Sequence, residues 1–193
     1  MDHDEPRPAS LLLEHLHLFK EKSLEGPVLD LACGNGHNGI FLAAGSIPVH
    51  LCDVSEEALT RARELAEKRG VKVQALQKDL EQESINPLPE ETYGAILVFR
   101  YLHRPLFPSI RKALKPGGIL IYETFTVDQP RFGKPRNPAF LLKPGELREQ
   151  FKEWEIIHYF EGILTNPDRA VAQIVCQKKA KNNHENTKAR NII

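Results

Sequence analysis

Short apolar runs alternate with amphipathic stretches along most of the chain, a pattern that predicts βαβ units and a mainly parallel sheet. The apolar runs predict strands over residues 28–32, 48–52, 71–76, 94–99, 119–124, 155–160 and 170–177. The stretches between them predict helices over residues 9–24, from the glycine-rich turn to 44, 55–70, 107–114 and 144–151. A helix-free connection of about nine residues joins the last two strands, which favours an antiparallel hairpin. The expected fold class is therefore α/β and doubly wound, with a mainly parallel seven-stranded sheet and an antiparallel C-terminal hairpin.

Three segments fall outside the sheet pattern. Residues 126–144 contain four prolines and little apolar periodicity, which predicts an inserted loop. Residues 179–193 are polar and unpatterned, and we expect them to be a disordered tail. The N-terminal helix, with Ser10 as its candidate cap, is either a lid over a ligand or an amphipathic helix docked on the sheet. A length of 193 residues suits one domain over residues 1–178, with its core over 26–178.

The charge balance limits the partners that we expect. The chain has 26 Lys plus Arg and 26 Asp plus Glu, so it has no basic field to attract nucleic acid or an anionic membrane. The acidic N-terminus differs from a signal peptide and no apolar run is long enough to cross a bilayer, so we expect a soluble cytoplasmic protein. Cys33, Cys52 and Cys176 lack metal-ligand or paired spacing, which predicts free buried thiols and neither a disulfide nor a metal site.

The stretch VLDLACGNGHNG, residues 28–39, carries the clearest chemical signal. Gly34, Gly36 and Gly39 spell GxGxxG between a strand and a helix, which lets backbone amides and a helix N-terminus approach a ligand. Asp53, nineteen residues beyond Gly34, is placed to accept from ribose hydroxyls. Both a dinucleotide and S-adenosylmethionine fit these features. The alternatives are that the glycines meet only backbone geometry and that Asp53 caps the next helix.

Three further features favour S-adenosylmethionine. Asp30 ends the first strand, where a carboxylate can hold a ligand ammonium but gains nothing from a pyrophosphate. Asp79 follows the third strand and can accept from the adenine amine while the next N–H meets the ring, although a solvated strand-end acid is the alternative. The closing hairpin also differs from the two parallel halves of a dinucleotide fold. His37, inside the glycine turn, faces either the sulfonium or solvent.

The motifs DLACGNG, LCDVS, KDL and LKPGG together resemble the class I S-adenosylmethionine-dependent methyltransferases over residues 26–177. The resemblance implies a Rossmann-like fold, methyl transfer and S-adenosylmethionine as cofactor. The usual first glycine of the family's D-x-G-x-G-x-G is Ala32 here. The YETF stretch and the loop after it resemble the tellurite-resistance-type branch, which implies small acceptors such as thiols or chalcogen oxyanions. The candidate cofactor-binding residues are Asp30, Ala32, Gly34, Gly36, His37, Asp53, Val54, Asp79 and Leu80.

Substrate contacts are expected after the fourth and fifth strands, because ligands gather at the carboxyl ends of strands in open α/β sheets. Basic side chains cluster in these segments and predict a pocket for an anionic small molecule, although solvated loop charges are the alternative. The candidates are Arg100, Tyr101, His103, Arg104, Tyr122, Glu123, Arg131, Lys134 and Arg136.

The expected reaction is an in-line displacement at the methyl carbon, which needs alignment and a dry pocket more than a strong base. An anionic acceptor requires no general base, and the sequence offers no Ser/His/Asp or Cys/His constellation. Two alternatives stay open at this point. One is an NAD(P)-binding oxidoreductase, although the chain has no Tyr-x-x-x-Lys pair. The other is a catalytically silent protein that binds S-adenosylmethionine as a sensor or scaffold.

Overall fold

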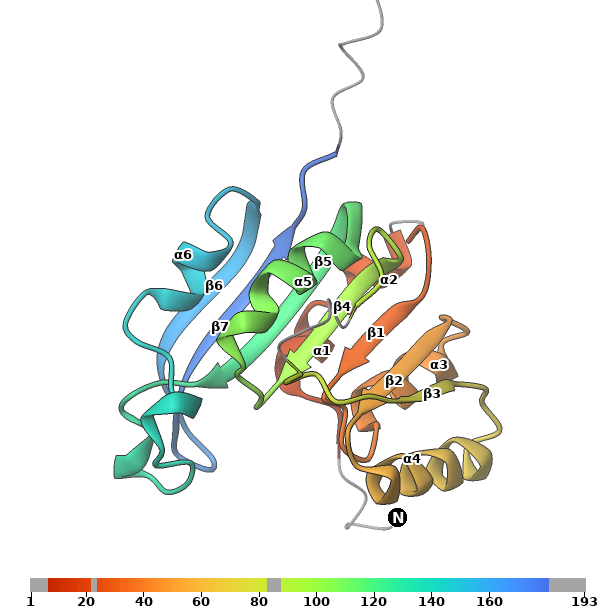
Figure 1. Ribbon diagram of the computed structural model, residues 1–193, viewed down its shortest axis with the longest axis horizontal. Helices are drawn as coiled ribbons and strands as arrows, with labels where there is room; N and C mark the ends of the chain where they lie inside the picture. The colour runs from red at the N-terminus through yellow and green to blue at the C-terminus, as the bar shows by residue number, and fades with distance from the viewer. Residues whose placement is uncertain (1–6, 22–23, 83–87, 181–193) are drawn as a thin grey trace, which may run out of the picture.

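A computed structural model describes residues 7–21, 24–82 and 88–180. It contains one sheet with the strand order β3-β2-β1-β4-β5-β7-β6 (Figure 1). The strands are β1 Val28–Leu31, β2 Val49–Asp53, β3 Gln74–Gln77, β4 Tyr93–Phe99, β5 Leu114–Phe125, β6 Glu155–Leu164 and β7 Arg169–Gln177. The α-helices are α1 Ser10–Glu14, α2 His17–Glu21, α3 His37–Ala44, α4 Glu56–Lys68, α5 Phe107–Ala113 and α6 Glu146–Gln150.

The pairing of the strands confirms the predicted fold class. Strands β3, β2, β1, β4 and β5 run parallel. Strand β7 is antiparallel to β5, and β6 is antiparallel to β7, so the chain closes with the expected hairpin. The carboxyl ends of the parallel strands therefore lie at one edge of the sheet, the same edge as the loop that follows β5 (Figure 1).

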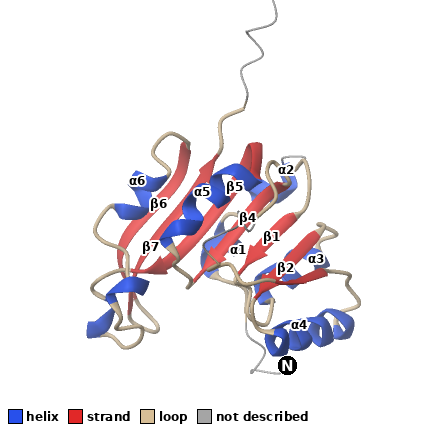
Figure 2. Cartoon of the chain, in the orientation of Figure 1, coloured by secondary structure: helices blue, strands red, loops and turns tan. Residues whose placement is uncertain are grey.

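Helices cover both faces of the sheet and enclose two hydrophobic cores (Figure 2). Phe107 of α5 and Leu147 of α6 pack in the core of one face, and Ile40 of α3 and Leu59 of α4 pack in the core of the other. Strand β1 is buried along its whole length because it contributes side chains to both cores. A central strand of this kind holds the residues after its carboxyl end in a fixed position.

The N-terminal segment differs from the single helix predicted over residues 9–24. It forms two short helices, α1 and α2, and α2 ends at Glu21. The ring of His15 bonds the carbonyl oxygen of Leu11 at 3.0 Å, the acceptor that the continuing backbone would use. Ser10 is not the cap: the N-cap is Ala9, whose own N–H donates to Asn38 Oδ1 at 2.8 Å.

Two strands also begin at residues other than those predicted, because pairing with a neighbouring strand sets where they start. Strand β5 begins at Leu114 and not at 119, because Leu114 pairs with Tyr93 before a register shift in β4. The Pro-Gly-Gly stretch therefore lies inside the strand. Strand β3 begins at Gln74 and not at 71, and its register is set by pairing with β2 from Gln74 to Gln77.

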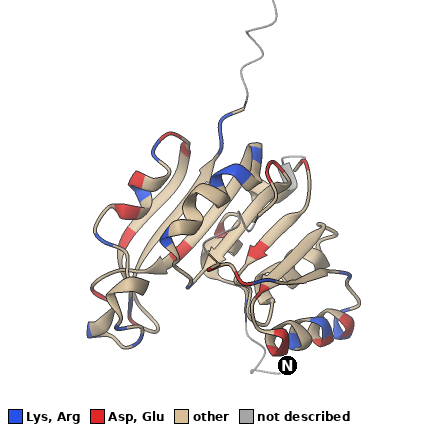
Figure 3. Cartoon of the chain, in the orientation of Figure 1, with Lys and Arg blue, Asp and Glu red and all other residues tan. Residues whose placement is uncertain are grey.

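Residues 126–144 form an ordered loop with two 3-10 turns, Gln129–Arg131 and Pro138–Phe140. The buried side chain of Gln129 anchors this loop: its Nε2 donates to the carbonyl of Lys134 at 3.0 Å, and its Oε1 accepts from the N–H of Ala170 at 2.9 Å. Figure 3 shows basic residues in this loop.

Two predictions concern the rest of the chain. The tail predicted over 179–193 lies, from residue 181 onward, outside the described residues. Across the three described ranges, none of the helices combines the length and the apolar character needed to span a bilayer.

Candidate functional site

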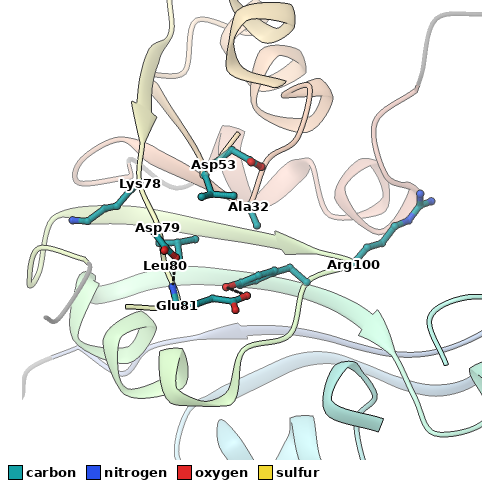
Figure 4. Close-up of a pocket in the computed structure, with 9 residues that line it drawn as sticks. Ala32, Asp53, Lys78, Asp79, Leu80, Glu81 and Arg100 are labelled. Carbon is teal, nitrogen blue, oxygen red and sulfur yellow. Dashed lines mark hydrogen bonds between the residues drawn. The ribbon is translucent and has the colours of Figure 1, made fainter. Parts of the chain in front are cut away.

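A pocket of about 490 Å³ opens where the carboxyl ends of the parallel strands meet (Figure 4). Its walls come from the segments that follow β1, β2, β3 and β4. We call it the donor pocket, after the role that we propose for it under Proposed function. Its lining residues are Ala32, Asp53, Val54, Lys78, Asp79, Leu80, Glu81, Arg100 and Tyr101.

Asp53 is oriented by backbone amides on both of its oxygens. The N–H of Gly34 donates to Oδ2 at 2.8 Å, and the N–H of Ser55 donates to Oδ1 at 2.9 Å. The alternative role as a helix cap belongs to Ser55, whose Oγ accepts from the N–H of Ala58 at 3.2 Å. A carboxylate has about four acceptor positions, so the Asp53 oxygens retain capacity for hydroxyl donors in the pocket.

Asp30 lies beneath the glycine turn and not among the residues that line the donor pocket. Its side chain is buried, and Oδ2 accepts from the N–H of Gly39 at 2.8 Å. Burial raises the pKa of Asp30 to about 7, while the Gly39 N–H lowers it and the Asp53 charge raises it. The carboxylate therefore fixes the first turn of α3. Its predicted contact with a ligand ammonium stays a prediction.

Close packing accounts for two of the three glycines, Gly36 and Gly39. Gly36 has a φ of 73°, and a Cβ there would lie 2.9 Å from Leu51 Cδ1. A Cβ at Gly39 would lie 2.5 Å from Leu51 Cδ2 and 3.1 Å from Asp30 Oδ2. Side chains at either position would push α3 away from β2 and disturb the Asp30 bond. The GxGxxG pattern thus has a structural cause in addition to the predicted approach of a ligand.

Two residues that line the donor pocket have left-handed backbones although neither is glycine. Ala32 follows β1 with a φ of 52°, and Arg100 follows β4 with a φ of 57°. The N–H of Arg100 donates to the carbonyl of Glu123 at 2.8 Å, which fixes this turn to the end of β5. Left-handed conformations of this kind are unfavourable for residues with a Cβ and concentrate at functional sites.

The segment after β3 forms the opposite wall of the donor pocket (Figure 4). Asp79 Oδ1 accepts from the N–H of Glu81 at 2.9 Å and so closes a tight turn. The hydroxyl of Tyr101 donates to Glu81 Oε1 at 3.4 Å, and burial and the Glu81 charge raise the pKa of that hydroxyl. Val54 is 60% exposed, an apolar surface that a ligand in the pocket would cover.

The sequence reasoning missed Lys78 and Glu81, which both line the donor pocket. Glu81 also lines a second, adjoining pocket. The available signal was its position two residues after Asp79, within a turn rich in carboxylates. That signal is weak, because exposed glutamates are common and the pairing with Tyr101 depends on a separate strand.

The second pocket has a volume of about 700 Å³. We call it the acceptor pocket, again after its proposed role. It lies between the segment after β4 and the 126–144 loop, and it shares Glu81, Arg100 and Tyr101 with the donor pocket. Its other lining residues are Leu102, Phe125, Lys134, Pro135, Arg136, Asn137 and Phe140.

The structure separates the predicted substrate residues into two groups. Arg100, Tyr101, Lys134 and Arg136 line the acceptor pocket. The other five, His103, Arg104, Tyr122, Glu123 and Arg131, do not line it. Arg104 pairs with Glu146, Tyr122 donates to the carbonyl of Tyr101, and Glu123 accepts from Gln173. Arg131 lies over the ring of Phe132, and His103 precedes a 3-10 turn. His37, Gly34 and Gly36 of the cofactor set likewise do not line the donor pocket.

The two pockets differ in charge. Asp53, Asp79 and Glu81 bring three carboxylates to the donor pocket, and in Figure 4 the two cations there, Lys78 and Arg100, point away from the carboxylates. The acceptor pocket has three cations, Arg100, Lys134 and Arg136, and the single carboxylate of Glu81. The donor pocket therefore suits a cationic ligand and the acceptor pocket an anionic one.

Comparison with known proteins adds an independent line of observation. Residues 28–118 match a family described as a methyltransferase domain. The chain is 30% identical over 145 residues to the probable S-adenosyl-L-methionine-dependent methyltransferase TehB of Haemophilus influenzae. That match covers 70% of this chain and 48% of the relative. The chain thus spans about half the length of the curated relatives it matches.

Solved structures share the fold. The crystal structure of TehB from Haemophilus influenzae has a TM-score of 0.69 at 23% identity, over 86% of this chain and 62% of that one. A magnesium protoporphyrin IX methyltransferase from Synechocystis, solved with bound SAH, has a TM-score of 0.67 at 17% identity, over 88% and 82%. The predicted resemblance to this family is confirmed. In its motifs, strand order and sequence match, the chain is similar to the class I S-adenosylmethionine-dependent methyltransferases, and it shares their fold.

Proposed function

We propose that this protein transfers the methyl group of S-adenosylmethionine to a small, anionic acceptor. The observation that carries the proposal is the pair of adjoining pockets with opposite charge and a shared wall of Glu81, Arg100 and Tyr101. A cationic donor on one side of that wall and an anionic acceptor on the other are brought together with the methyl group between them. The relatives named as methyltransferases support the reaction class.

In this proposal the donor pocket binds the nucleoside by its polar and apolar walls. Asp53 accepts from the ribose hydroxyls, and Asp79 accepts from the adenine amine while the N–H of Leu80 meets the ring. Exposed Val54 packs against the adenine. Ala32 and the glycine turn approach the amino-acid part of the ligand. Asp30, Gly34, Gly36 and His37 then act from beneath or beside the pocket by fixing this turn.

S-adenosylmethionine supplies an electrophilic methyl carbon and a neutral thioether leaving group. The chain contributes alignment, exclusion of water and a local charge that favours the sulfonium. Glu81 is the carboxylate at the shared wall that can accept a proton from a neutral acceptor, and Tyr101 orients it. Cys33 is not a candidate nucleophile, because burial raises the pKa of its thiol and keeps it protonated.

The acceptor classes that the resemblance implies are thiols and chalcogen oxyanions, and both are compatible with a pocket lined by Arg100, Lys134 and Arg136. The alternative of an NAD(P)-binding oxidoreductase is disfavoured, since three carboxylates line the pocket and a dinucleotide carries an anionic pyrophosphate. A catalytically silent binder would show donor affinity and no turnover.

Calorimetric titration with S-adenosylmethionine, S-adenosylhomocysteine and NADH tests the proposal. We expect micromolar affinity for the two adenosyl ligands and none for NADH. Asp53→Ala should weaken binding at least about tenfold, because the ribose loses a charged acceptor. The control Asp168→Ala, in the exposed turn between β6 and β7, should bind as the wild type does. Binding of NADH alone would refute the proposal, and adenosyl binding without methyl transfer to any acceptor would favour the silent binder.

A further inference from the structure

The acceptor pocket is much larger than a bare oxyanion requires. A water molecule occupies about 30 Å³ in the liquid, so an oxyanion of four heavy atoms needs on the order of 100 Å³. The pocket has a volume of about 700 Å³, which lies in the range of sites for organic ligands. An oxyanion alone would leave most of this volume to water, next to a reaction that benefits from its exclusion.

Apolar side chains form much of the wall. Leu102 from the segment after β4 and Phe125 at the end of β5 lie on the sheet side, and Pro135 and Phe140 belong to the 126–144 loop. Phe140 is 47% exposed, although large apolar side chains are usually buried. A ligand with an apolar body would cover these surfaces, with a gain of about 25 cal/mol for each Å² removed from water.

The charged groups are distributed unevenly between the two ends of the pocket. Glu81 and Arg100 lie at the wall shared with the donor pocket, whereas Lys134 and Arg136 line only the acceptor pocket. An anionic group close to the methyl carbon would lie beside the Glu81 carboxylate, which repels it. The same group beside Lys134 and Arg136 would meet two cations of the 126–144 loop, whereas Glu81, the one carboxylate that lines this pocket, belongs to the shared wall.

The backbone that carries these two cations is held by specific contacts. The side chain of Gln129 donates to the carbonyl of Lys134 at 3.0 Å. On the other side of Arg136, Asn137 Oδ1 accepts from the N–H of Ala139 at 3.0 Å and caps a 3-10 turn. Arg104 donates to the carbonyl of Ala139 at 2.9 Å. These contacts preorganise the cations and distinguish them from charges on an unrestrained loop.

We propose that the acceptor is an organic anion with an apolar body and two distinct ends. The methyl-accepting atom lies at the shared wall beside Tyr101 and Glu81, and a carboxylate or phosphate at the other end binds Lys134 and Arg136. The apolar body lies between them against Leu102, Phe125 and Phe140. This inference rests on the proposed function and narrows its acceptor class from small anions in general to organic acids.

The test compares acids with their neutral esters. The probes are para-mercaptohydrocinnamate and para-hydroxyhydrocinnamate, the methyl ester of each, and selenite. Calorimetry in the presence of S-adenosylhomocysteine measures binding, and S-adenosylhomocysteine formation measures kcat/KM. We expect each acid to bind about tenfold more tightly than its ester, because the acid alone engages the two cations. Selenite should be the poorer substrate.

Two variants assign the preference to named residues. Lys134→Gln/Arg136→Gln should bind acid and ester equally well and should bind S-adenosylhomocysteine as the wild type does. The control Arg131→Gln removes a cation from the same loop but outside both pockets, and it should keep the preference for the acid.

The outcomes separate the two proposals. Equal binding of acids and esters to the wild type, or a higher kcat/KM for selenite than for the organic probes, overturns the present inference while donor binding stands. Loss of the preference in Arg131→Gln also overturns it, because the charge effect would then be diffuse. Failure of the wild type to bind S-adenosylhomocysteine instead overturns the proposed function, and the acceptor role of the second pocket with it.

Discussion

Arg104 and Glu146 form a two-point ion pair, with Nε 2.6 Å from Oε1 and Nη2 2.8 Å from Oε2. Arg104 follows β4 and Glu146 begins α6, so the pair joins segments on either side of the 126–144 loop. The guanidinium also donates to the carbonyls of Ala139 and Leu141. This arginine was predicted to bind an anionic substrate, but its donors are used to hold the loop that carries Lys134 and Arg136.

We therefore expect Arg104→Gln to weaken acceptor binding indirectly. The KM for an acid probe should rise about tenfold because the loop loses a preorganising contact. The free energy of unfolding should fall by about 1–3 kcal/mol, since two carbonyls and a partly buried carboxylate lose their donor. Affinity for S-adenosylhomocysteine should stay unchanged. Steady-state kinetics, urea unfolding and calorimetry measure the three quantities.

The matched control is Arg63→Gln, which breaks an exposed pair with Glu56 on α4. It should change stability by less than about 1 kcal/mol and leave the KM unchanged. A donor affinity that falls together with acceptor affinity in Arg104→Gln would show that the variant disturbs the whole sheet edge and would contradict the prediction.

Asp30→Asn should change the dependence of stability on pH. The pKa of Asp30 rises from 3.8 in the unfolded chain to about 7 in the fold, chiefly because of burial. The folded state therefore holds its proton more tightly. The stability associated with protonated Asp30 is fully present below about pH 4 and is lost as the pH rises through about 7. Fully ionised, the buried carboxylate costs about 4 kcal/mol.

The variant has no such ionisation, and its amide oxygen can still accept from the N–H of Gly39. Relative to the wild type it should gain stability as the pH rises from about 5 to about 8 in urea unfolding. Its affinity for S-adenosylmethionine should fall, because the charge beneath the turn is gone. A stability difference that is the same at both pH values would show that Asp30 ionises normally. Exposed Asp128→Asn provides the control.

Ala32→Gly should stabilise the protein. Its φ of 52° costs a residue with a Cβ about 1–2 kcal/mol, and glycine removes that cost while adding roughly 0.5–1 kcal/mol of unfolded-state entropy. We expect a net gain of about 0.5–1 kcal/mol in thermal or urea unfolding. Ser46→Gly, at a φ of 64° in the turn after α3, should give a similar gain. Only Ala32→Gly should alter donor affinity, since Ser46 lies outside the donor pocket. No gain at either position would contradict the strain argument.

Leu12→Ala tests the role of the N-terminal helices. Leu12 is completely buried in the core on the side of α3 and α4, whereas its neighbour Leu13 is 43% exposed. We expect Leu12→Ala to lower the free energy of unfolding by about 2–5 kcal/mol and Leu13→Ala to have almost no effect. Donor affinity of the folded variant should match the wild type. Reduced donor affinity without a loss of stability would instead support a lid.

The sequence was informative wherever local pattern and buried core agree. The apolar runs located all seven strands, and the short connection before residue 170 predicted the hairpin, because a helix-free link cannot make a parallel crossover. Boundaries failed where a specific contact decides them. The ring of His15 bonds the carbonyl oxygen of Leu11 where the first helix ends, and pairing with Tyr93 extends β5 back to Leu114. The apolar pattern predicts neither contact.

The candidate site likewise has residues that local sequence could locate and residues that depend on distant contacts. The turn around Gly34 and the carboxylates Asp53 and Asp79 lie together because strand order alone fixes where their segments meet. The sequence could not show which of the predicted arginines line a pocket and which hold the structure together. Arg104 and Arg136 are the same residue type beside a proline, and Arg104 is structural because Glu146 and the carbonyls of Ala139 and Leu141 accept from its guanidinium. Glu81 went unnoticed because its partner Tyr101 comes from another strand.

Strand β7 comes last in the chain but lies between β5 and β6 in the sheet. This position limits the order in which the strands can join the sheet during synthesis. Residues 32–101 supply every side chain that lines the donor pocket, and they leave the ribosome before β6. Strand β6 pairs with β7, so it has no place on the sheet until residues 169–177 have been made. The N–H of Ala170, at the start of β7, also donates to Gln129 in the 126–144 loop. The topology thus allows the donor pocket to form first during synthesis, whereas the 126–144 loop that lines the acceptor pocket is fastened to the final strand only after that strand has been made.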